Sequence, residues 1–159
     1  MKYLIEPAGV GGHAQALDML GRLLGEENPV LEHDSMGAPY LPQYSSVHVS
    51  ISHCRTAVAV ALSLHGKVGI DVESRRKVNP SLIHRVCTEA ECTVIEANAD
   101  PIWEFLHLWT RKEAVLKCVG TGIRGFGSMQ QALQTPGITV QEIPCPIADT
   151  VAALAFTAE

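Results

Sequence analysis

The segment LWTRKEAVLKCVGTG, residues 108–122, carries the pattern that decides the fold of this chain. Its apolar residues recur at helical spacing, which predicts a helix that ends at Gly120. Lys112 falls near the middle of this apolar stripe, and Glu113 and Lys117 lie along its edge, four residues apart. A lysine within an apolar stripe costs stability unless something pairs with its charge. Two interpretations stay open here: Lys112 extends to solvent beside an ordinary surface ion pair, or these charges belong to a site.

The composition is typical of a globular domain. The chain has 159 residues, of which 47% are hydrophobic and 18% charged, which suffices for one domain or for two small halves that share a core. No apolar run reaches the length of a membrane span, and a net charge of −5 argues against nucleic-acid binding by bulk electrostatics. Glu6 and Pro7 interrupt the opening segment too early for a signal peptide. The five cysteines form no CxxC pair, so we expect free thiols in a reducing cytoplasm.

Periodicity and capping residues predict an α+β arrangement. Helical spacing, capping boxes and N-terminal prolines predict helices at 13–24, 80–86, 88–98 and 101–120. Alternating or continuous apolar runs predict strands at 47–51, 57–64 and 68–72, then at 138–143 and 151–156. Short turns join the first three strands, so we expect them to form an antiparallel meander. We also expect a short strand near 30–31 and an extended segment at 39–42.

A pair of carboxylates lies at the end of the third predicted strand. In the segment GIDVE, residues 69–73, Asp71 and Glu73 share one face of the strand. Two carboxylates on one face repel unless they are solvated or a cation bridges them, and oxygen ligands beside basic residues suit Mg²⁺ that holds a phosphate. A strand that simply runs out to the surface is the alternative.

The segment SISHC, residues 50–54, places a histidine at the end of a strand. Neighbours on a strand point to opposite faces, so Ser52 and His53 do not form a serine-protease-like triad. Nothing in the sequence marks Cys54 as an activated nucleophile, so a buried thiol is expected there.

Three segments in this order resemble the motifs of the 4′-phosphopantetheinyl transferase superfamily. They are PYLP with the later SH (39–42 and 52–53), GIDVE (69–73), and WTRKEAVLK with GTG (109–117 and 120–122). The first segment and its spacing are similar to the larger, surfactin-synthetase-activating type, and the resemblance covers about residues 13–156. It implies a single α+β domain, 1–159, in which an antiparallel sheet packs on helices in two pseudo-related halves. A shortened N-terminal half would span about 1–64, and a C-terminal half at 65–159 would carry the metal site of a monomer.

The resemblance also implies roles for the charged residues. Asp71, Glu73 and Glu113 would hold Mg²⁺ on the pyrophosphate of coenzyme A, and Glu113 would also take the proton from the acceptor serine. Lys112 and Lys117 would contact phosphate oxygens, with Lys117 the better candidate for charge that develops on the leaving side.

The nucleotide part of coenzyme A would lie against the earlier segments. Ser52 and His53 would face the nucleotide, with His53 near the 3′-phosphate, while Gly37 and Pro39 would border the adenine. The implied reaction transfers the 4′-phosphopantetheine arm of coenzyme A to a serine of an acyl or peptidyl carrier protein and releases 3′,5′-adenosine bisphosphate. Positioning and charge neutralisation would supply most of the catalysis.

The sequence departs from the family pattern in its first half. Ala38 stands where the motif has a lysine, and little sequence precedes the first predicted helix. These departures favour an alternative function, that of a weak or inactive relative that only binds coenzyme A or a carrier protein. A different Mg²⁺-dependent phosphate enzyme would leave the SHC segment and the Gly-Thr-Gly loop unexplained. A purely structural protein would leave the paired carboxylates and Lys112 without a cause.

Overall fold

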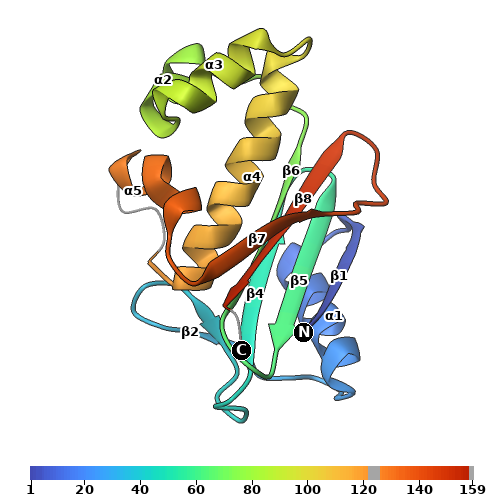
Figure 1. Ribbon diagram of the computed structural model, residues 1–159. Coiled ribbons are helices and arrows are strands. Elements are labelled where there is room, and N and C mark those ends of the chain that lie inside the picture. The colour runs from blue at the N-terminus through green and yellow to red at the C-terminus, as the bar shows by residue number, and fades with distance from the viewer. Residues whose placement is uncertain (122–125, 158–159) are drawn as a thin grey trace.

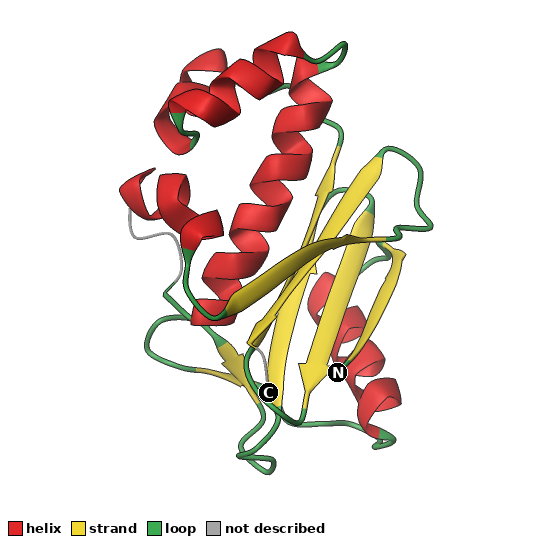
Figure 2. Ribbon diagram, in the orientation of Figure 1, coloured by secondary structure: helices red, strands yellow, loops and turns green. Residues whose placement is uncertain are grey.

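In the computed structural model, which describes residues 1–121 and 126–157, two antiparallel sheets pack on each other and on helices (Figure 1). The strands are β1 (Lys2–Pro7), β2 (Glu32–His33), β3 (Pro39–Tyr40), β4 (His48–His53), β5 (Ala57–Ser63), β6 (Val68–Ser74), β7 (Ile138–Ile143) and β8 (Thr150–Thr157). The helical elements are α1 (Gly12–Leu24), α2 (Pro80–Val86), α3 (Glu89–Ala97), α4 (Pro101–Val119), α5 (Phe126–Gln131) and the 3₁₀ turn η1 (Ala132–Gln134). Figure 2 shows these elements by type. This arrangement confirms the predicted α+β class with antiparallel sheets packed on helices.

The sheet order corrects the predicted meander. One sheet has the order β1-β5-β4-β3-β2, and the other has the order β6-β8-β7. The antiparallel pairing of β4 with β5 is as predicted, but β6 pairs with β8 and not with β5. Strand β1 was not predicted, and it pairs with β5 along its full length. The division of the chain into two pseudo-related halves stays a prediction.

Strand β5 explains why the two sheets stack instead of merging into one. Its small residues Ala57, Ala59 and Ala61 belong to a core that also contains Ile70 of β6 and Leu154 of β8. Its larger alternate residues lie in a second core, against the buried face of α1. Because successive strand residues point to opposite faces, β5 is buried on both sides, and its alanine face allows β6 and β8 to approach closely.

Helix α4 lies along the face of the second sheet (Figure 1). The helix begins as predicted, with Asp100 as the N-cap and Pro101 in the first turn, and it ends at Gly120 in the left-handed conformation. Gly69 permits the close approach, because a Cβ at this position would overlap the carbonyl oxygen of Ala114 and the amide of Cys118. The glycine of the GIDVE segment is therefore a packing requirement of the helix–strand contact.

The remaining predicted elements lie close to their expected bounds. Helices α1, α2 and α3 and strands β7 and β8 match within a residue or two, and the capping box at Thr88 and Glu91 is formed. The short strand expected at 30–31 is displaced to β2, and α5 with η1 was not expected. Within residues 1–121 and 126–157, no helix combines the length and the apolar character that crossing a membrane requires.

Candidate functional site

A cavity of about 450 Å³ lies where β4, β6, α4 and the start of α1 meet. Most of the residues predicted to form a site line it: Gly37, Pro39, Ser52, His53, Asp71, Glu73, Glu113 and Lys117. A groove of about 740 Å³ along the C-terminal part of α1 is larger, but it contains none of these residues. We therefore assign the candidate site from its chemistry and not from its size.

Asp71 lies at the base of this cavity and is 5% exposed. Its Oδ1 accepts hydrogen bonds from the Ser52 hydroxyl and the Lys117 ammonium, each at 2.7 Å. Its Oδ2 is buried and has no partner among the described residues. Burial raises the pKa of this carboxyl above its ordinary value, against the opposing effect of Lys117. A buried carboxylate oxygen without a partner is costly, so the geometry favours a ligand at Oδ2.

Glu113 and Glu73 bring two more carboxylates to the cavity. The pKa of Glu113 is raised to about 7, first by burial and then by the nearby charges of Asp71 and Glu73, against the opposing effect of Lys117. Glu73 is less buried, and its Oε2 accepts from the Arg76 guanidinium at 3.2 Å. The mutual repulsion of these carboxylates is the condition that a bound cation relieves.

The carboxylate oxygens of the cavity are donors that suit a hard cation, although they are not arranged around one point. Across the described ranges 1–121 and 126–157, no group of three or more His, Cys, Asp or Glu side chains is arranged to hold a metal ion. One reason is that Lys117 already occupies Oδ1 of Asp71. The unpartnered Oδ2 of Asp71 and the pKa of Glu113, which burial raises first, nevertheless mark a desolvated group of carboxylates. A cation could gain three carboxylate ligands there only after these side chains rearrange.

Lys117 links three parts of the structure. Its ammonium donates to Asp71 and, more weakly, to the carbonyl oxygens of Ile51 at 3.4 Å and Ile70 at 3.3 Å. Its side chain is 30% exposed and borders the cavity, so its positive charge reaches any anion bound there.

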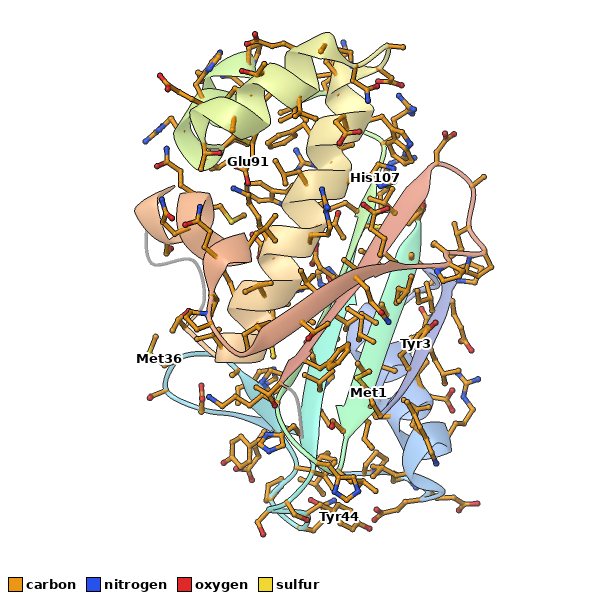
Figure 3. All side chains as sticks on the ribbon, in the orientation of Figure 1. Met1, Tyr3, Met36, Tyr44, Glu91 and His107 are labelled. Atoms are coloured by element: carbon orange, nitrogen blue, oxygen red, sulfur yellow. The ribbon has the colours of Figure 1, made fainter. Side chains whose placement is uncertain are left out.

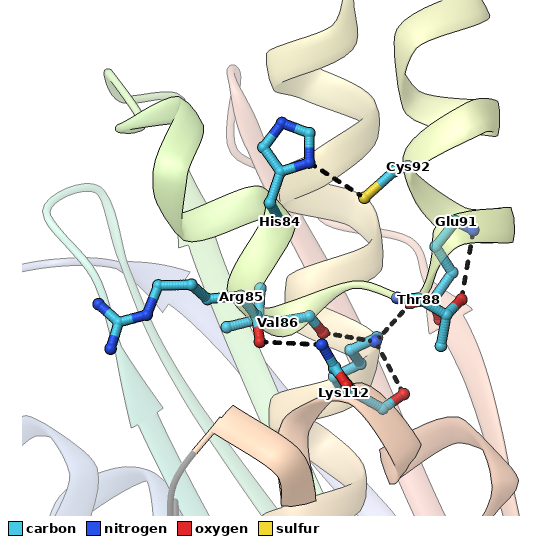
Figure 4. Close-up of polar contacts among 8 residues, drawn as sticks. His84, Arg85, Val86, Thr88, Glu91, Cys92 and Lys112 are labelled. Carbon is cyan, nitrogen blue, oxygen red and sulfur yellow. Dashed lines mark hydrogen bonds and ion pairs between the residues drawn. The ribbon is translucent and has the colours of Figure 1, made fainter.

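The structure does not bring Lys112 to the cavity. Its side chain is 0% exposed, and its ammonium donates to Glu91 Oε2 at 2.7 Å and to the carbonyl oxygens of Val86 and Gln130 (Figure 4). Glu91 extends from α3 toward α4 to meet it (Figure 3). The expected phosphate contact of Lys112 is therefore replaced by a structural one, because neighbouring residues of a helix point about 100° apart. Lys112 faces the helices while Glu113 faces the cavity.

The partner of Lys112 also belongs to the capping box of α3. Glu91 Oε2 accepts from the backbone amide of Thr88 at 2.7 Å as well as from Lys112. The buried charge of Lys112 thus has three acceptors, one of which is its ionic partner Glu91, and they offset its desolvation. The sequence signal for this partner was the capping box itself, although the pattern did not show which charge it would meet.

Histidines border the outer part of the cavity. His53 was predicted there, whereas His13 at the start of α1 and His33 in β2 were missed. A Cβ at Gly12 would lie 3.9 Å from Cδ2 of His53, so the first turn of α1 adjoins the end of β4. Only the fold brings these elements together, and no local sequence pattern marks them.

Two further predicted features lie beside the cavity. Ala38 lines smaller neighbouring hollows of about 360 and 170 Å³, which also share Pro39 and Lys117. Of the Gly-Thr-Gly loop, Gly120 adopts a left-handed conformation as the helix C-cap, whereas Gly122 lies outside the described residues.

Comparison with known proteins identifies a family model over half of the chain. The model described as the 4′-phosphopantetheinyl transferase superfamily matches residues 67–149, which include the GIDVE segment and the whole of α4. The chain is 29% identical over 121 residues to 4′-phosphopantetheinyl transferase psf-1 of Bacillus pumilus, covering 74% of this chain and 52% of that protein. It is also 29% identical over 111 residues to the 4′-phosphopantetheinyl transferase of Bacillus subtilis, covering 68% of this chain and 49% of that one.

A third similar protein is 4′-phosphopantetheinyl transferase gsp of Aneurinibacillus migulanus. It is 29% identical over 99 residues, which are 61% of this chain and 40% of that protein. The chain thus spans about half the length of the curated relatives it matches.

Proposed function

Because the chain belongs to the 4′-phosphopantetheinyl transferase superfamily, we propose that it transfers the 4′-phosphopantetheine arm of coenzyme A to a serine of an acyl or peptidyl carrier protein. The observation that carries this proposal is the cavity lined by Asp71, Glu73 and Glu113, in which Oδ2 of Asp71 is buried and has no partner among the described residues. The donor set suits Mg²⁺, and a cavity of this size suits part of a nucleotide.

The carboxylates have the first role in this proposal. Asp71, Glu73 and Glu113 would hold Mg²⁺, which supplies positive charge at the pyrophosphate of coenzyme A. Lys117, at the edge of the same cavity, would add a second positive charge toward the phosphate oxygens. Neutralisation and alignment of the phosphates are the main sources of rate in phosphoryl transfer.

Glu113 is the proposed base for the acceptor serine. In the metal-free protein, burial and the neighbouring carboxylates raise its pKa to about 7, which makes it a stronger proton acceptor than an ordinary glutamate. The serine oxygen would attack the phosphorus that bears the pantetheine arm, with its proton passing to Glu113, directly or through water. The bond to the other phosphate breaks, and 3′,5′-adenosine bisphosphate leaves.

The outer cavity is the proposed nucleotide subsite. Gly37 and Pro39 would border the adenine, and His53 would lie near the 3′-phosphate, in keeping with their positions along the cavity. Both predicted halves of the chain contribute to this cavity, His53 from the first and Asp71 from the second, so a monomer is the proposed state.

A second candidate function rests on Ala38. A lysine is expected at this position from the family motif, so the chain lacks one cationic contact for the nucleotide. A relative that binds coenzyme A or a carrier protein without efficient transfer would fit this departure.

One assay separates the two candidates. The protein is incubated with Mg²⁺, coenzyme A and apo carrier proteins of several types, and the intact mass of each carrier is measured. We expect a gain of one phosphopantetheine arm, abolished by Glu113→Gln and Asp71→Asn and retained in the exposed control Glu96→Gln. Coenzyme A binding without any mass gain would support the second candidate. A mass gain that survives both site substitutions would refute the assigned residues.

A further inference from the structure

A polar joint between the two sheets lies directly beside the candidate site. Strand β6 is at the end of its sheet and forms its backbone ladder with β8. At its other edge it meets side chains of β4: the amides of Ile70 and Val72 donate to the hydroxyls of Ser50 at 3.0 Å and Ser52 at 3.3 Å. Two serine hydroxyls therefore take the place of the carbonyl oxygens that a neighbouring strand would offer.

The two serines differ in one contact. Both are buried, with 3% of Ser50 and 7% of Ser52 exposed, and both face β6 because alternate residues of a strand share a face. Within the part of the chain that the structure describes, Ser52 alone has a second partner, because its hydroxyl donates to Oδ1 of Asp71 at 2.7 Å. A hydroxyl has a single proton, so this contact uses the whole donor capacity of Ser52.

The consequence for Asp71 is a fixed orientation. Its Oδ1 accepts from Ser52 and from Lys117, both at 2.7 Å, which leaves Oδ2 as the oxygen available to a ligand. Groups that hydrogen-bond a ligating side chain orient it and often change metal affinity 10- to 100-fold when removed.

The geometry points to Ser52 as a positioning residue: its hydroxyl holds the Asp71 carboxylate by Oδ1 and leaves Oδ2 for the cation. This role differs from the nucleotide contact that the family resemblance implies for Ser52. The inference rests on the proposed function, since the cation is the Mg²⁺ proposed above.

Ser50 supplies a matched control for the test. Ser50→Ala and Ser52→Ala each remove one hydroxyl from the same face of β4 and leave one buried amide of β6 unpaired. Both variants should therefore melt at a lower temperature than the wild type. Only Ser52→Ala also removes one of the two hydrogen bonds to Oδ1 of Asp71 and leaves the one from Lys117. A difference between the two variants therefore reports on how the carboxylate is held and not on the contact between the strands.

The experiment measures cation and nucleotide binding separately. Mg²⁺ is titrated into the wild type and both variants, with and without 3′,5′-adenosine bisphosphate, by calorimetry and by the rise in melting temperature. The nucleotide is then titrated at saturating Mg²⁺. We expect Ser52→Ala to weaken Mg²⁺ binding about 10- to 100-fold, Ser50→Ala to change it less than about threefold, and nucleotide affinity at saturating Mg²⁺ to change less than about threefold in both.

Several results would overturn the inference. They are equal Mg²⁺ affinity in the two variants, a loss of nucleotide affinity in Ser52→Ala at unchanged Mg²⁺ affinity, and a wild type that binds no Mg²⁺ under either condition. If Ser52→Ala does not fold, Ser52→Cys keeps the volume with a weak donor and should show the same loss, while Ser52→Thr keeps the hydroxyl and should retain Mg²⁺ binding. Mg²⁺ binding that depends on Ser52, without transfer to any carrier protein, would refute the proposed function and leave the positioning role intact.

Discussion

Replacement of Glu113 by glutamine should stabilise the metal-free protein at high pH. In the folded protein the pKa of the Glu113 carboxyl is raised from 4.5 to about 7, first by burial and then by the charge of Asp71. The folded state therefore binds more protons than the unfolded state between these two values. The free energy of unfolding must fall as the pH rises through this window, and the full stability is present only below it. Glutamine has nearly the same shape and no such titration.

The size of the effect follows from the change in pKa. One pKa unit corresponds to about 1.4 kcal/mol, so a rise from 4.5 to about 7 sets an upper limit of roughly 3 kcal/mol. Glu113 is partly exposed, and solvent screening lowers the expected value to roughly 2 kcal/mol. For a domain of this size, that difference corresponds to about 4–8 °C in Tm. The variant should exceed the wild type by this amount near pH 8.5 and match it near pH 4.5, about the ends of the titration window.

Urea unfolding in the presence of a chelator, followed by circular dichroism across this pH range, measures the difference. Glu96→Gln on α3 is the control, because this exposed carboxylate lies outside the cavity and should not change the pH profile. Added Mg²⁺ should restore the wild type at high pH by mass action and restore Glu113→Gln much less. Parallel pH profiles for the wild type and Glu113→Gln would refute the reasoning, because Glu113 would then not lie in a desolvated, negatively charged site.

Three further substitutions test the packing and the subsite. Gly69→Ala should lower the free energy of unfolding by about 3 kcal/mol in urea titrations, because its Cβ meets backbone atoms of α4 that cannot move aside; a loss below about 1 kcal/mol would contradict this packing. Lys112→Met should lower the free energy of unfolding by about 3 kcal/mol, because it leaves Glu91 without its ionic partner. The KM for coenzyme A should stay unchanged, because Lys112 does not contact the substrate. A raised KM at normal stability would show that Lys112 belongs to the site. Ala38→Lys should tighten coenzyme A binding roughly threefold to tenfold at low salt, measured by calorimetry, through one added charge contact; unchanged affinity would separate this position from the nucleotide.

Capping residues and apolar periodicity predicted α4 and the face of β6 that packs on it, because these signals lie within the elements themselves. Asp100 and Pro101 mark where α4 begins, and Gly120 in the left-handed conformation ends it. Asp71 and Glu73 share a face of β6, as the period of a strand requires, and that face meets α4 at Gly69. The pairing of β6 could not be predicted in this way, because a short connection from β5 permits either a hairpin or a step to a second sheet.

Lys112 shows the limit of a pattern within a single helix. Its place in the apolar stripe left open whether the charge reaches solvent or belongs to a site, and the structure instead shows it buried and paired with Glu91. The stripe did not indicate which partner, since Glu91 lies in another helix and becomes available only when α3 packs on α4. The same limit applies to His13 and His33, which approach the cavity from α1 and β2. Tertiary packing decides such contacts, and neither the spacing nor the type of the residues predicts how the elements pack.

Lys117 contacts both the carboxylate of the candidate site and the strands that form the contact between the two sheets. An ammonium has three donors, and those of Lys117 contact Asp71, the carbonyl oxygen of Ile51 on β4 and that of Ile70 on β6. The two carbonyl contacts, at 3.4 and 3.3 Å, are much longer than the 2.7 Å contact to Asp71 and are therefore the weaker ones. A phosphate oxygen that draws Lys117 into the cavity would displace a carbonyl before it displaces the carboxylate. Nucleotide binding would then loosen the contact between the two sheets and keep Asp71 in place, so the joint at Ser52 has to hold β4 against β6 while the substrate is bound.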